Sequence, residues 1–489
     1  NRFYAHLQRL PISFFARTTP GDLMSRAVND MMSIRSFFGP ALMNLVNTAV
    51  VYLTALSIMT WINPTLTLAA LLPVPFLIVT VQKVSRRLYA RSRRVQERLA
   101  ELSNRVQENL SGIQLIKTYA LEEREMANFN RLAGLYRQEN LALARVRGAL
   151  VPLMGSMGGA SALIALWVGG RLVAAGTITL GEFVAFSGYL GMLVWPTVAM
   201  GWVINGFQRG LVAMNRLQEI LRSPPETADR PADMSIASLG GGIEIRDLTL
   251  RHPGKETPVL EHLSLTIDAG EIVALVGPVG SGKSTIANIL ARFVPVPDCT
   301  VFMDGHDINR IPLEVLRRSI GYAPQEAFLF SRSMADNIAF GLDHPQPGEV
   351  EKAAMRAGLE RDLAGFPEGL KTRVGEGGLT LSGGQRQRTA LARAVAVAPR
   401  ILILDDSLSS VDVDTERAVL KELGALMKDR TTLLISHRFA TVTWADRIIV
   451  LKDGRVTESG THDELLAAGG LYKNLFTRQA STTGPRERI

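Results

Sequence analysis

The sequence predicts two folds in tandem: an all-α transmembrane bundle, followed by an α/β domain built around a phosphate-binding loop. Long uncharged stretches fill the first half, a proline- and glycine-containing linker follows, and the second half holds a strand, a glycine-rich loop and a helix in succession. A chain of 489 residues also exceeds one ordinary domain. We therefore expect a membrane domain at 1–222, a linker at 223–242, an α/β domain at 243–481 and a polar tail at 482–489.

Uncharged stretches in the first half predict four membrane spans. No charged residue lies between Arg35 and Lys83, which is long enough for two spans of about 20 residues with a turn at 61–64. Two further uncharged stretches lie at 148–170 and 183–208, each sized for one span. Buried helices of soluble proteins rarely run this long without an ionisable group, so the membrane is favoured.

Basic residues predict the orientation of these spans. The turn at 61–64 carries no charge, whereas the segment between the second and third spans carries Lys83, Arg86, Arg87, Arg91, Arg93, Arg94, Arg98 and Arg105. Such segments face the cytoplasm and its anionic lipids, so we expect a multi-pass protein of the cell membrane with a cytoplasmic α/β domain. A single aromatic residue, Tyr89, lies among these basic residues, and this lack of regular interleaving argues against a nucleic-acid partner. The single cysteine, Cys299, allows no internal disulfide.

The long basic segment itself has a helical pattern. Apolar residues recur at three- and four-residue intervals between 84 and 138, so the spans should continue into the cytoplasm as helices. Gly112 and the cluster at 120–124 mark the expected reversals. Within the first span one helical face carries Asn44, Asn47, Thr48, Val51 and Thr54, and Asn205 and Gln208 lie near the end of the fourth. These polar residues either line a substrate pathway or bond neighbouring helices.

A phosphate-binding loop follows the strand expected at 271–276. Glycines let backbone N–H groups face a phosphate, and the helix that begins directly afterwards adds its dipole. Lys283 then reaches the outer phosphates, and Ser284 is placed to hold Mg²⁺. The residues expected to bind the phosphates are Gly277, Pro278, Val279, Gly280, Ser281, Gly282, Lys283, Ser284 and Thr285.

A second apolar strand, at 401–404, ends in two carboxylates. In folds of this class its tip lies beside the phosphate loop, so Asp405 is expected to complete the Mg²⁺ site. Two aspartates after a strand also occur in ordinary turns, but the apolar strand and the upstream phosphate loop favour the metal site.

Five further motifs occur in an order that resembles one family. Leu381–Gln385 reads Leu-Ser-Gly-Gly-Gln, the signature of ATP-binding-cassette (ABC) transporters. The others are similar to that family's Q-loop at Gln325, its D-loop at 409–412, its switch histidine at His437 and the exporter-type loop at 372–377. The chain thus resembles an exporter-type half-transporter, in particular the degenerate-site subunit of bacterial heterodimeric multidrug exporters.

The resemblance extends to the first half of the chain. Residues 1–222 resemble the last four of that family's six membrane helices, and 9–30 resembles its first coupling loop. The resemblance therefore implies that two further helices precede Asn1, and the polar helical stretch at the start is interpreted as a truncated chain and not as a signal peptide.

The resemblance implies ATP and Mg²⁺ as cofactors and a second half-transporter as partner. Two cassettes would close head to tail, so that the signature residues of one chain meet the ATP held by the other chain. It implies catalytic roles for Asp406, His437 and Gln325, and Mg²⁺ binding by Ser284, Gln325 and Asp405. The signature residues that bind the nucleotide would be Ser382, Gly383, Gly384 and Gln385.

Two positions depart from the family pattern. His252 stands where a tyrosine usually stacks on adenine, and Asp406 stands where a glutamate usually acts as general base. The second departure indicates a heterodimer with one weak and one competent ATP site, exporting a hydrophobic or amphipathic substrate. Two alternatives stay open: a homodimeric lipid or drug exporter that uses Asp406 as base, and an ATP-gated regulatory membrane subunit. The motifs do not predict which substrate is moved.

Overall fold

The computed structural model describes residues 1–225, 232–251, 257–346, 348–378 and 380–482. The chain forms two compact units: Gly21–Arg222, and Asn1–Pro20 together with Ser223–Ile489. The sequence predicts a membrane domain that begins at residue 1, whereas the structure groups Asn1–Pro20 with the C-terminal unit. The segment forms two short helices, α1 (Arg2–Leu7) and α2 (Ile12–Arg17), because Pro11 and the extended backbone of Thr18 interrupt it.

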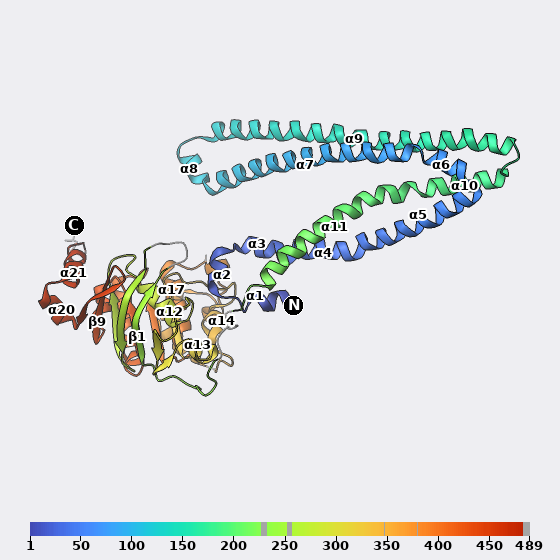
Figure 1. Cartoon of the computed structure of the whole chain (residues 1–489). Coiled ribbons are helices and arrows are strands. Elements are labelled where there is room, and N and C mark those ends of the chain that lie inside the picture. The colour runs from blue at the N-terminus through green and yellow to red at the C-terminus, as the bar shows by residue number, and fades with distance from the viewer. Residues whose placement is uncertain (226–231, 252–256, 347, 379, 483–489) are drawn as a thin grey trace. The chain divides into compact units, whose positions relative to one another are not determined.

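The unit Gly21–Arg222 is helical (Figure 1). The elements in order are α3 (Pro20–Ser25), π-helical η1 (Arg26–Asp30), α4 (Met31–Ser36), π-helical η2 (Phe37–Ala41), α5 (Leu42–Ile62), α6 (Pro64–Leu71), α7 (Pro73–Ser111), α8 (Ile113–Thr118), α9 (Glu122–Ala174), α10 (Leu180–Met192) and α11 (Val194–Leu221). Between α7 and α9 the chain reverses its direction through two turns, at Gly112 and around Ala120, as the sequence predicts. Ala120 has a positive φ of 49°.

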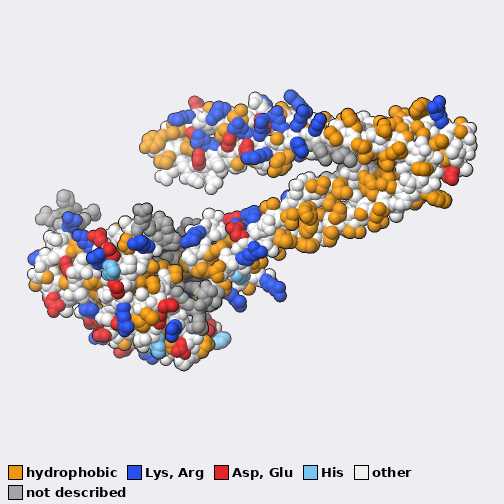
Figure 2. Space-filling view, in the orientation of Figure 1, with side chains coloured by type: hydrophobic (Ala, Val, Ile, Leu, Met, Phe, Trp, Pro, Cys, Tyr) orange, Lys and Arg blue, Asp and Glu red, His pale blue; other side chains and the backbone are white. Residues whose placement is uncertain are grey.

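Apolar side chains cover one end of this helical unit. Within the described residues one helical segment, Pro20–Ile62, is by itself long and apolar enough to cross a membrane, and only 17% of its most apolar window is buried. Shorter apolar helices occupy Pro64–Phe76 and Gly158–Ala174. Figure 2 shows hydrophobic side chains gathered over α5 and α10, and Lys and Arg over the stretches of α7 and α9 nearer α8. The count of four spans stays a prediction.

The polar residues expected on one face of the first span bond mainly to their own helix. Asn44 Nδ2 donates to the Pro40 carbonyl over 2.8 Å, and Thr54 Oγ1 donates to the Val50 carbonyl over 2.8 Å. A hydrogen bond between helices is made by Tyr52, another residue of α5. Its hydroxyl lies 2.5 Å from the Thr197 hydroxyl of α11. Ion pairs also join η1 to α11 near the other end, where Arg26 lies 2.9 Å from Glu219.

The C-terminal unit contains two sheets. A six-stranded sheet has the order β10 (Arg455–Gly460), β9 (Arg447–Lys452), β3 (Ile272–Val276), β8 (Thr431–Ile435), β7 (Ile401–Asp405), β6 (Ile320–Ala323), and only the pairing of β10 is antiparallel. An antiparallel sheet has the order β2 (Leu260–Ile267), β1 (Ile243–Leu250), β4 (Val301–Met303), β5 (His306–Asp307). Strands β3, β7 and β8 are buried at every residue, in keeping with the apolar sequence of β3 and the largely apolar sequences of β7 and β8, which include Asp405 and two threonines.

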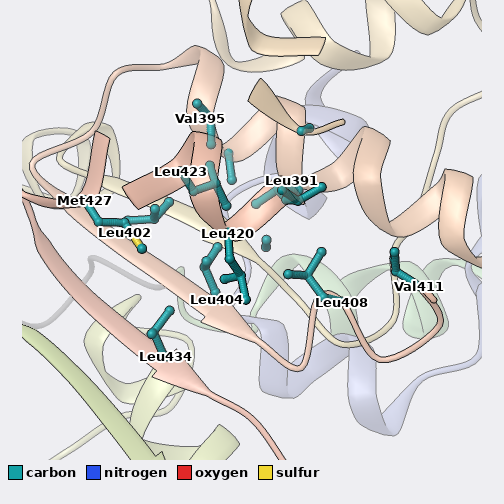
Figure 3. Close-up of a cluster of buried hydrophobic side chains, with 14 of the residues drawn as sticks. Leu391, Val395, Leu402, Leu404, Leu408, Val411, Leu420, Leu423, Met427 and Leu434 are labelled. Atoms are coloured by element: carbon teal, nitrogen blue, oxygen red, sulfur yellow. The ribbon is translucent and has the colours of Figure 1, made fainter. Parts of the chain in front are cut away.

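Helices cover both faces of the larger sheet. Alternate residues of β3 face two different cores: Val273 and Leu275 join one, and Ala274 and Val276 join the other. Figure 3 shows the second core, where side chains of α17 and α18 meet β7. The helices are α12 (Lys283–Leu290), α13 (Leu313–Arg318), α14 (Met334–Ile338), η3 (Ala339–Gly341), α15 (Glu349–Arg356), α16 (Glu360–Gly365), η4 (Gly369–Lys371), η5 (Glu376–Gly378), α17 (Gly383–Ala396), α18 (Val413–Met427), α19 (Phe439–Val442), α20 (His462–Ala468) and α21 (Leu471–Thr482).

The parallel arrangement of β3, β8 and β7 gathers the predicted site at one edge. The loop after β3 begins at Gly277, β7 ends at Asp405, and His437 follows β8 by two residues. Because the strands are parallel and adjacent in the order β3-β8-β7, their carboxyl ends meet at the same edge of the sheet.

Candidate active site

The loop between β3 and α12 is built on glycines that no other residue replaces without strain. A Cβ added to Gly277 would lie 2.1 Å from the Leu451 carbonyl oxygen. Gly282, the N-cap of α12, has a φ of 101°, and a Cβ there would lie 2.6 Å from Leu260 Cδ2. The curled backbone leaves the exposed tip, Pro278 to Gly280, in front of the helix N-terminus. This cradle is suited to a phosphate group.

Lys283 is held within this loop. Its ammonium donates to the carbonyls of Gly277 and Pro278, each over 2.8 Å, and lies 3.3 Å from Ser281 Oγ. Only 6% of the residue is exposed, and burial lowers the pKa of its ammonium, while the nearby carboxylates of Asp405 and Asp406 raise it. A buried cation with exchangeable backbone partners is able to transfer its hydrogen bonds to phosphate oxygens.

Ser284 and Asp405 meet beside the lysine. The Ser284 hydroxyl donates to Asp405 Oδ1 over 3.1 Å. Burial is the main cause that raises the pKa of Asp405; Asp406 adds to this, while the bond from Ser284 and the charge of Lys283 oppose it. From the neighbouring strand β6, the Tyr322 phenol also interacts with this carboxylate, and burial raises the pKa of that phenol.

Asp406 occupies a left-handed backbone position directly after β7. Its φ is 48°, and its N–H donates to the Ile435 carbonyl at the end of β8 over 2.7 Å. The backbone N–H of His437 lies 3.4 Å from Asp406 Oδ1, so the structure brings the predicted base and the predicted switch histidine together. The ring of His437 belongs to an exposed residue.

The signature begins α17. Ser382 is the N-cap: its hydroxyl accepts from the Gln385 N–H over 3.2 Å, and the Gln385 side chain accepts from the Ser382 N–H over 2.9 Å. The Gln385 amide also donates to Asp362 over 3.0 Å. Within the described residues no hydrogen bond joins the signature to the phosphate loop of the same chain, so the structure does not bring these two predicted parts together.

Two other predicted residues lie apart from this cluster. Gln325 is exposed after β6, and its carbonyl lies 3.4 Å from the Gln387 amide nitrogen. His252, expected to stack on adenine, lies outside the described residues. The nucleotide-binding, catalytic and metal-binding roles of all these site residues, Thr285, Gly383 and Gly384 included, stay predictions.

The residues present fit Mg²⁺ together with a phosphate-bearing ligand. Ser284 and Asp405 offer a hydroxyl and a carboxylate oxygen, which are the ligands that Mg²⁺ prefers, and the ion usually takes its remaining ligands from phosphates and water. Over the described ranges no group of three or more His, Cys, Asp or Glu side chains is placed to hold a metal ion, as expected for a site that relies on the phosphates.

Comparison with known proteins identifies the chain. Residues 1–197 match the family described as "ABC transporter transmembrane region", and 260–409 match the family "ABC transporter". The probable multidrug resistance ABC transporter ATP-binding/permease protein YheI of Bacillus subtilis (strain 168) is 36% identical over 484 residues, which cover 98% of this chain and 82% of the relative. The chain belongs to the ABC transporter family.

Other comparisons place this ABC transporter among exporters. The multidrug resistance-like ATP-binding protein MdlA of Buchnera aphidicola subsp. Schizaphis graminum (strain Sg) is 32% identical over 99% of this chain and 83% of its own length. The solved structure of a bacterial Atm1-family ABC exporter with ATP bound has a TM-score of 0.83 and 29% identity, and covers 98% of this chain and 84% of that chain. The predicted half-transporter, with a transmembrane domain fused to an ABC domain, is confirmed.

An ABC half-transporter of this kind is a membrane protein that pairs with a second subunit and couples ATP hydrolysis to transport.

Sequence reasoning missed three residues of the site: Tyr322 beside Asp405, and Gln387 and Arg438 beside the D-loop. A signal existed for Tyr322, because it lies on the strand that pairs with the one ending in Asp405.

Proposed function

We propose that this ABC exporter chain is one half of a heterodimer whose own ATP site binds MgATP and hydrolyses it slowly. The observation that carries the proposal is Asp406, which stands directly after the Mg²⁺ aspartate where the family pattern has glutamate. Aspartate and glutamate have similar intrinsic acidity, so the difference is one of reach. One methylene fewer withdraws the carboxylate by about 1.3 Å, and misplacement on that scale costs roughly 10²-fold in rate.

The surroundings of Asp406 support a weak base. Its N–H is committed to the Ile435 carbonyl, which fixes the backbone at the end of β7. One carboxylate oxygen lies 3.4 Å from the His437 N–H, which draws the side chain toward the loop after β8. With the backbone fixed there, the aspartate carboxylate ends farther from a water at the outer phosphate than a glutamate carboxylate does.

The remaining residues support normal nucleotide binding. Lys283 exchanges its bonds to Gly277 and Pro278 for phosphate oxygens, and the loop N–H groups bind the same phosphates. Ser284 and Asp405, with Gln325 approaching from its exposed loop, hold Mg²⁺, which neutralises charge on the outer phosphates. The pairing of Ser284 with Asp405 keeps both oxygens together before the metal binds.

The signature of this chain serves the ATP of the partner. Ser382 is exposed at the N-terminus of α17, where its N–H and hydroxyl belong to a helix cap and the helix dipole favours a phosphate. In a head-to-tail dimer this exposed signature meets the ATP that the phosphate loop of the partner subunit holds. In a heterodimer, that subunit carries the glutamate and supplies the faster site.

A hydrophobic or amphipathic substrate is supported by the membrane unit and by the relatives. A cavity of about 480 Å³ lies among the apolar helices and is lined by uncharged residues, including Tyr52, Phe183, Leu190 and Thr197. Relatives in Bacillus subtilis and Buchnera aphidicola bear names that refer to multidrug resistance. The basic stretch of α7 supports a cytoplasmic cassette and a location in the cell membrane.

Purification of the full-length chain from its own cells tests the proposal. A tag on this chain should recover a second half-transporter in equal amount, one with Asp-Glu at the end of the strand that matches β7. In that complex, labelled nucleotide trapped on this chain should stay ATP while nucleotide on the partner becomes ADP. Recovery of this chain alone as a dimer, with equal conversion in both copies, would contradict the heterodimer and favour the homodimeric exporter.

A further inference from the structure

The D-loop, Ser409–Asp412, is held from two sides by side chains that no predicted motif includes. From α17, Gln387 accepts the Ser410 N–H at Oε1 over 2.8 Å and donates to Ser409 Oγ over 2.9 Å. Beyond His437, Arg438 donates to the Ser409 carbonyl over 2.6 Å and to the Val411 carbonyl over 2.7 Å. The D-loop backbone is thus fixed to the signature helix on one side and to the switch-histidine segment on the other.

Gln387 is a buried amide whose oxygen accepts one hydrogen bond from the D-loop and whose nitrogen donates one to it. Only 6% of the residue is exposed, and besides its two D-loop bonds the amide nitrogen lies 3.4 Å from the Gln325 carbonyl. A buried amide that only filled space would leave its N–H and C=O groups without hydrogen-bond partners, which destabilises the fold. Here the amide oxygen and nitrogen of Gln387, on the signature helix, form hydrogen bonds with the D-loop and with the Q-loop.

The D-loop also lies directly against the signature glycines. A Cβ on Gly384 would approach the Ser410 carbonyl oxygen to 3.0 Å, and one on Gly383 would approach Ser410 Cβ to 3.4 Å. Leu408 and Val411 flank Ser409 and Ser410 in the chain. They belong to the core that contains Leu391 of α17, which Figure 3 shows. Because the core is close-packed, a displacement of the D-loop is transmitted to α17.

Arg438 connects this assembly to the chain's own ATP site. It follows His437, whose N–H lies 3.4 Å from Asp406. Arg438 also pairs with Glu416, which is only 1% exposed and accepts a second bond from Thr441. Its position is therefore set by a buried network, and any shift of the segment after β8 is passed to the carbonyls of the D-loop.

We propose that Gln387 is a positioning residue that couples the two ATP sites. It ties the D-loop to the signature, so that the state of the Asp406 and His437 segment at this chain's site sets the placement of Ser382 at the partner's site. This inference rests on the proposed function, in which the signature serves the partner's ATP. The slow site then regulates the fast one through a chain of contacts from His437 through Arg438, the D-loop and Gln387 to α17.

The test is Gln387→Leu in the full-length complex, with ATP hydrolysis measured as kcat and KM. The leucine keeps the volume of the side chain and removes both bonds to the D-loop, so kcat should fall about tenfold while KM changes by less than about twofold. Gln387→Glu should recover most of kcat, because its carboxylate accepts from the Ser410 N–H and from the Ser409 hydroxyl. Ser409→Ala should give a smaller loss, and adding it to Gln387→Leu should cost little more.

Asn309→Leu is the matched control. Asn309 is also a buried amide, 3% exposed, and its amide nitrogen donates to the Val296 carbonyl and to Asp298, away from the D-loop. It should lower stability and leave kcat per folded complex unchanged. If Gln387→Leu lowers kcat no more than Asn309→Leu, or if Gln387→Glu is as slow as Gln387→Leu, the inference is wrong. Should Gln387→Leu fail to fold, the kcat of Ser409→Ala decides: a kcat equal to that of the unmodified complex contradicts the inference.

Ser382→Arg in the same preparation separates this inference from the proposed function. If Ser382→Arg leaves hydrolysis intact, the signature does not serve the partner's ATP and the proposed function fails. If Ser382→Arg stops hydrolysis while Gln387→Leu does not slow it, only the positioning role of Gln387 fails.

Discussion

The Ser284 hydroxyl lies 3.1 Å from a carboxylate oxygen of Asp405, although 121 positions separate the two residues in the chain. The contact exists because β3 and β7 lie on either side of β8 in one parallel register, so that the helix after β3 and the end of β7 meet. A hydroxyl and a carboxylate held together at a phosphate loop offer two of the six oxygen ligands of an octahedral Mg²⁺ ion. Their pairing leads to the first prediction.

Nucleotide binding at this site should depend on Mg²⁺ through Asp405. Asp405→Asn should weaken binding of a labelled ATP analogue in Mg²⁺ by roughly 10- to 100-fold and have a much smaller effect in the presence of EDTA, because the lost charge acts on the metal. Filter binding with both buffers measures the difference. Equal losses in Mg²⁺ and EDTA would show that Asp405 supports the fold and does not hold the metal.

The same carboxylate should make binding sensitive to acid. Burial raises the pKa of Asp405, so on acidification it takes up a proton at a higher pH than an ordinary aspartate does. The protonated acid does not hold Mg²⁺, and affinity for MgATP should therefore fall as the pH is lowered through this raised pKa. Asp405→Asn should bind weakly at all pH values. A wild-type affinity that stays constant from neutral to mildly acidic pH would contradict this assignment.

Lys283→Ala should weaken nucleotide retention on this chain by roughly 10- to 100-fold, because a charge-assisted bond to phosphate in a buried cradle is lost. Photolabelling with an azido-ATP analogue, followed by separation of the two subunits, measures each site by itself. Lys421→Ala, at an exposed position of α18, is the control and should label normally. Normal labelling of Lys283→Ala would remove the phosphate-binding role from this loop.

The phosphate loop and Asp405 were predictable because each is a short contiguous pattern in which strand, loop and helix follow one another. Ser382 and Gln385 form a capping box, and their three-residue spacing in the sequence indicates the start of a helix at this position. The contacts of Gln387 with Ser409 and Ser410 span 22 and 23 positions, and no local period records such pairs. Only the packing of α17 against β7 brings them together.

In the helical unit, too, some features could be predicted from the sequence and others could not. The turn at Gly112, which ends the 39-residue α7, was predictable because glycine is common where helices end, whereas the positive φ of Ala120 is known only from the structure. The π-helical turns η1 and η2 are not marked by the three- and four-residue apolar spacing that indicates a helix, although Pro40 lies inside η2. Grouping of Asn1–Pro20 with the cassette unit depends on tertiary contacts.

Cysteine labelling should establish the orientation of the membrane domain. In a Cys299→Ser background, needed because Cys299 is exposed, Trp61→Cys should react with an impermeant maleimide added to intact cells. Glu123→Cys, beside the reversal at Ala120, should react only after the cells are opened, because the basic helices face the cytoplasm. Labelling of Glu123→Cys alone in intact cells would invert the topology.

Ser382→Arg should remove most ATP hydrolysis by the complex, about 10²-fold or more, because a long cation at the cap blocks the outer phosphate held by the partner. Binding of ATP to this chain's own loop should be preserved, which photolabelling checks. Residual turnover close to the unmodified rate would show that this signature serves no fast site.

The central claim is that Asp406 makes this chain's site slow while the partner's site carries turnover. Steady-state ATP hydrolysis by the purified complex with Asp406→Asn measures it most directly, with Asp406→Glu as the matched variant that restores reach. We expect Asp406→Asn to lower total turnover by less than about twofold, and Asp406→Glu to speed hydrolysis at this site. If Asp406→Asn stops turnover altogether, Asp406 is the working base, and the asymmetric heterodimer is contradicted.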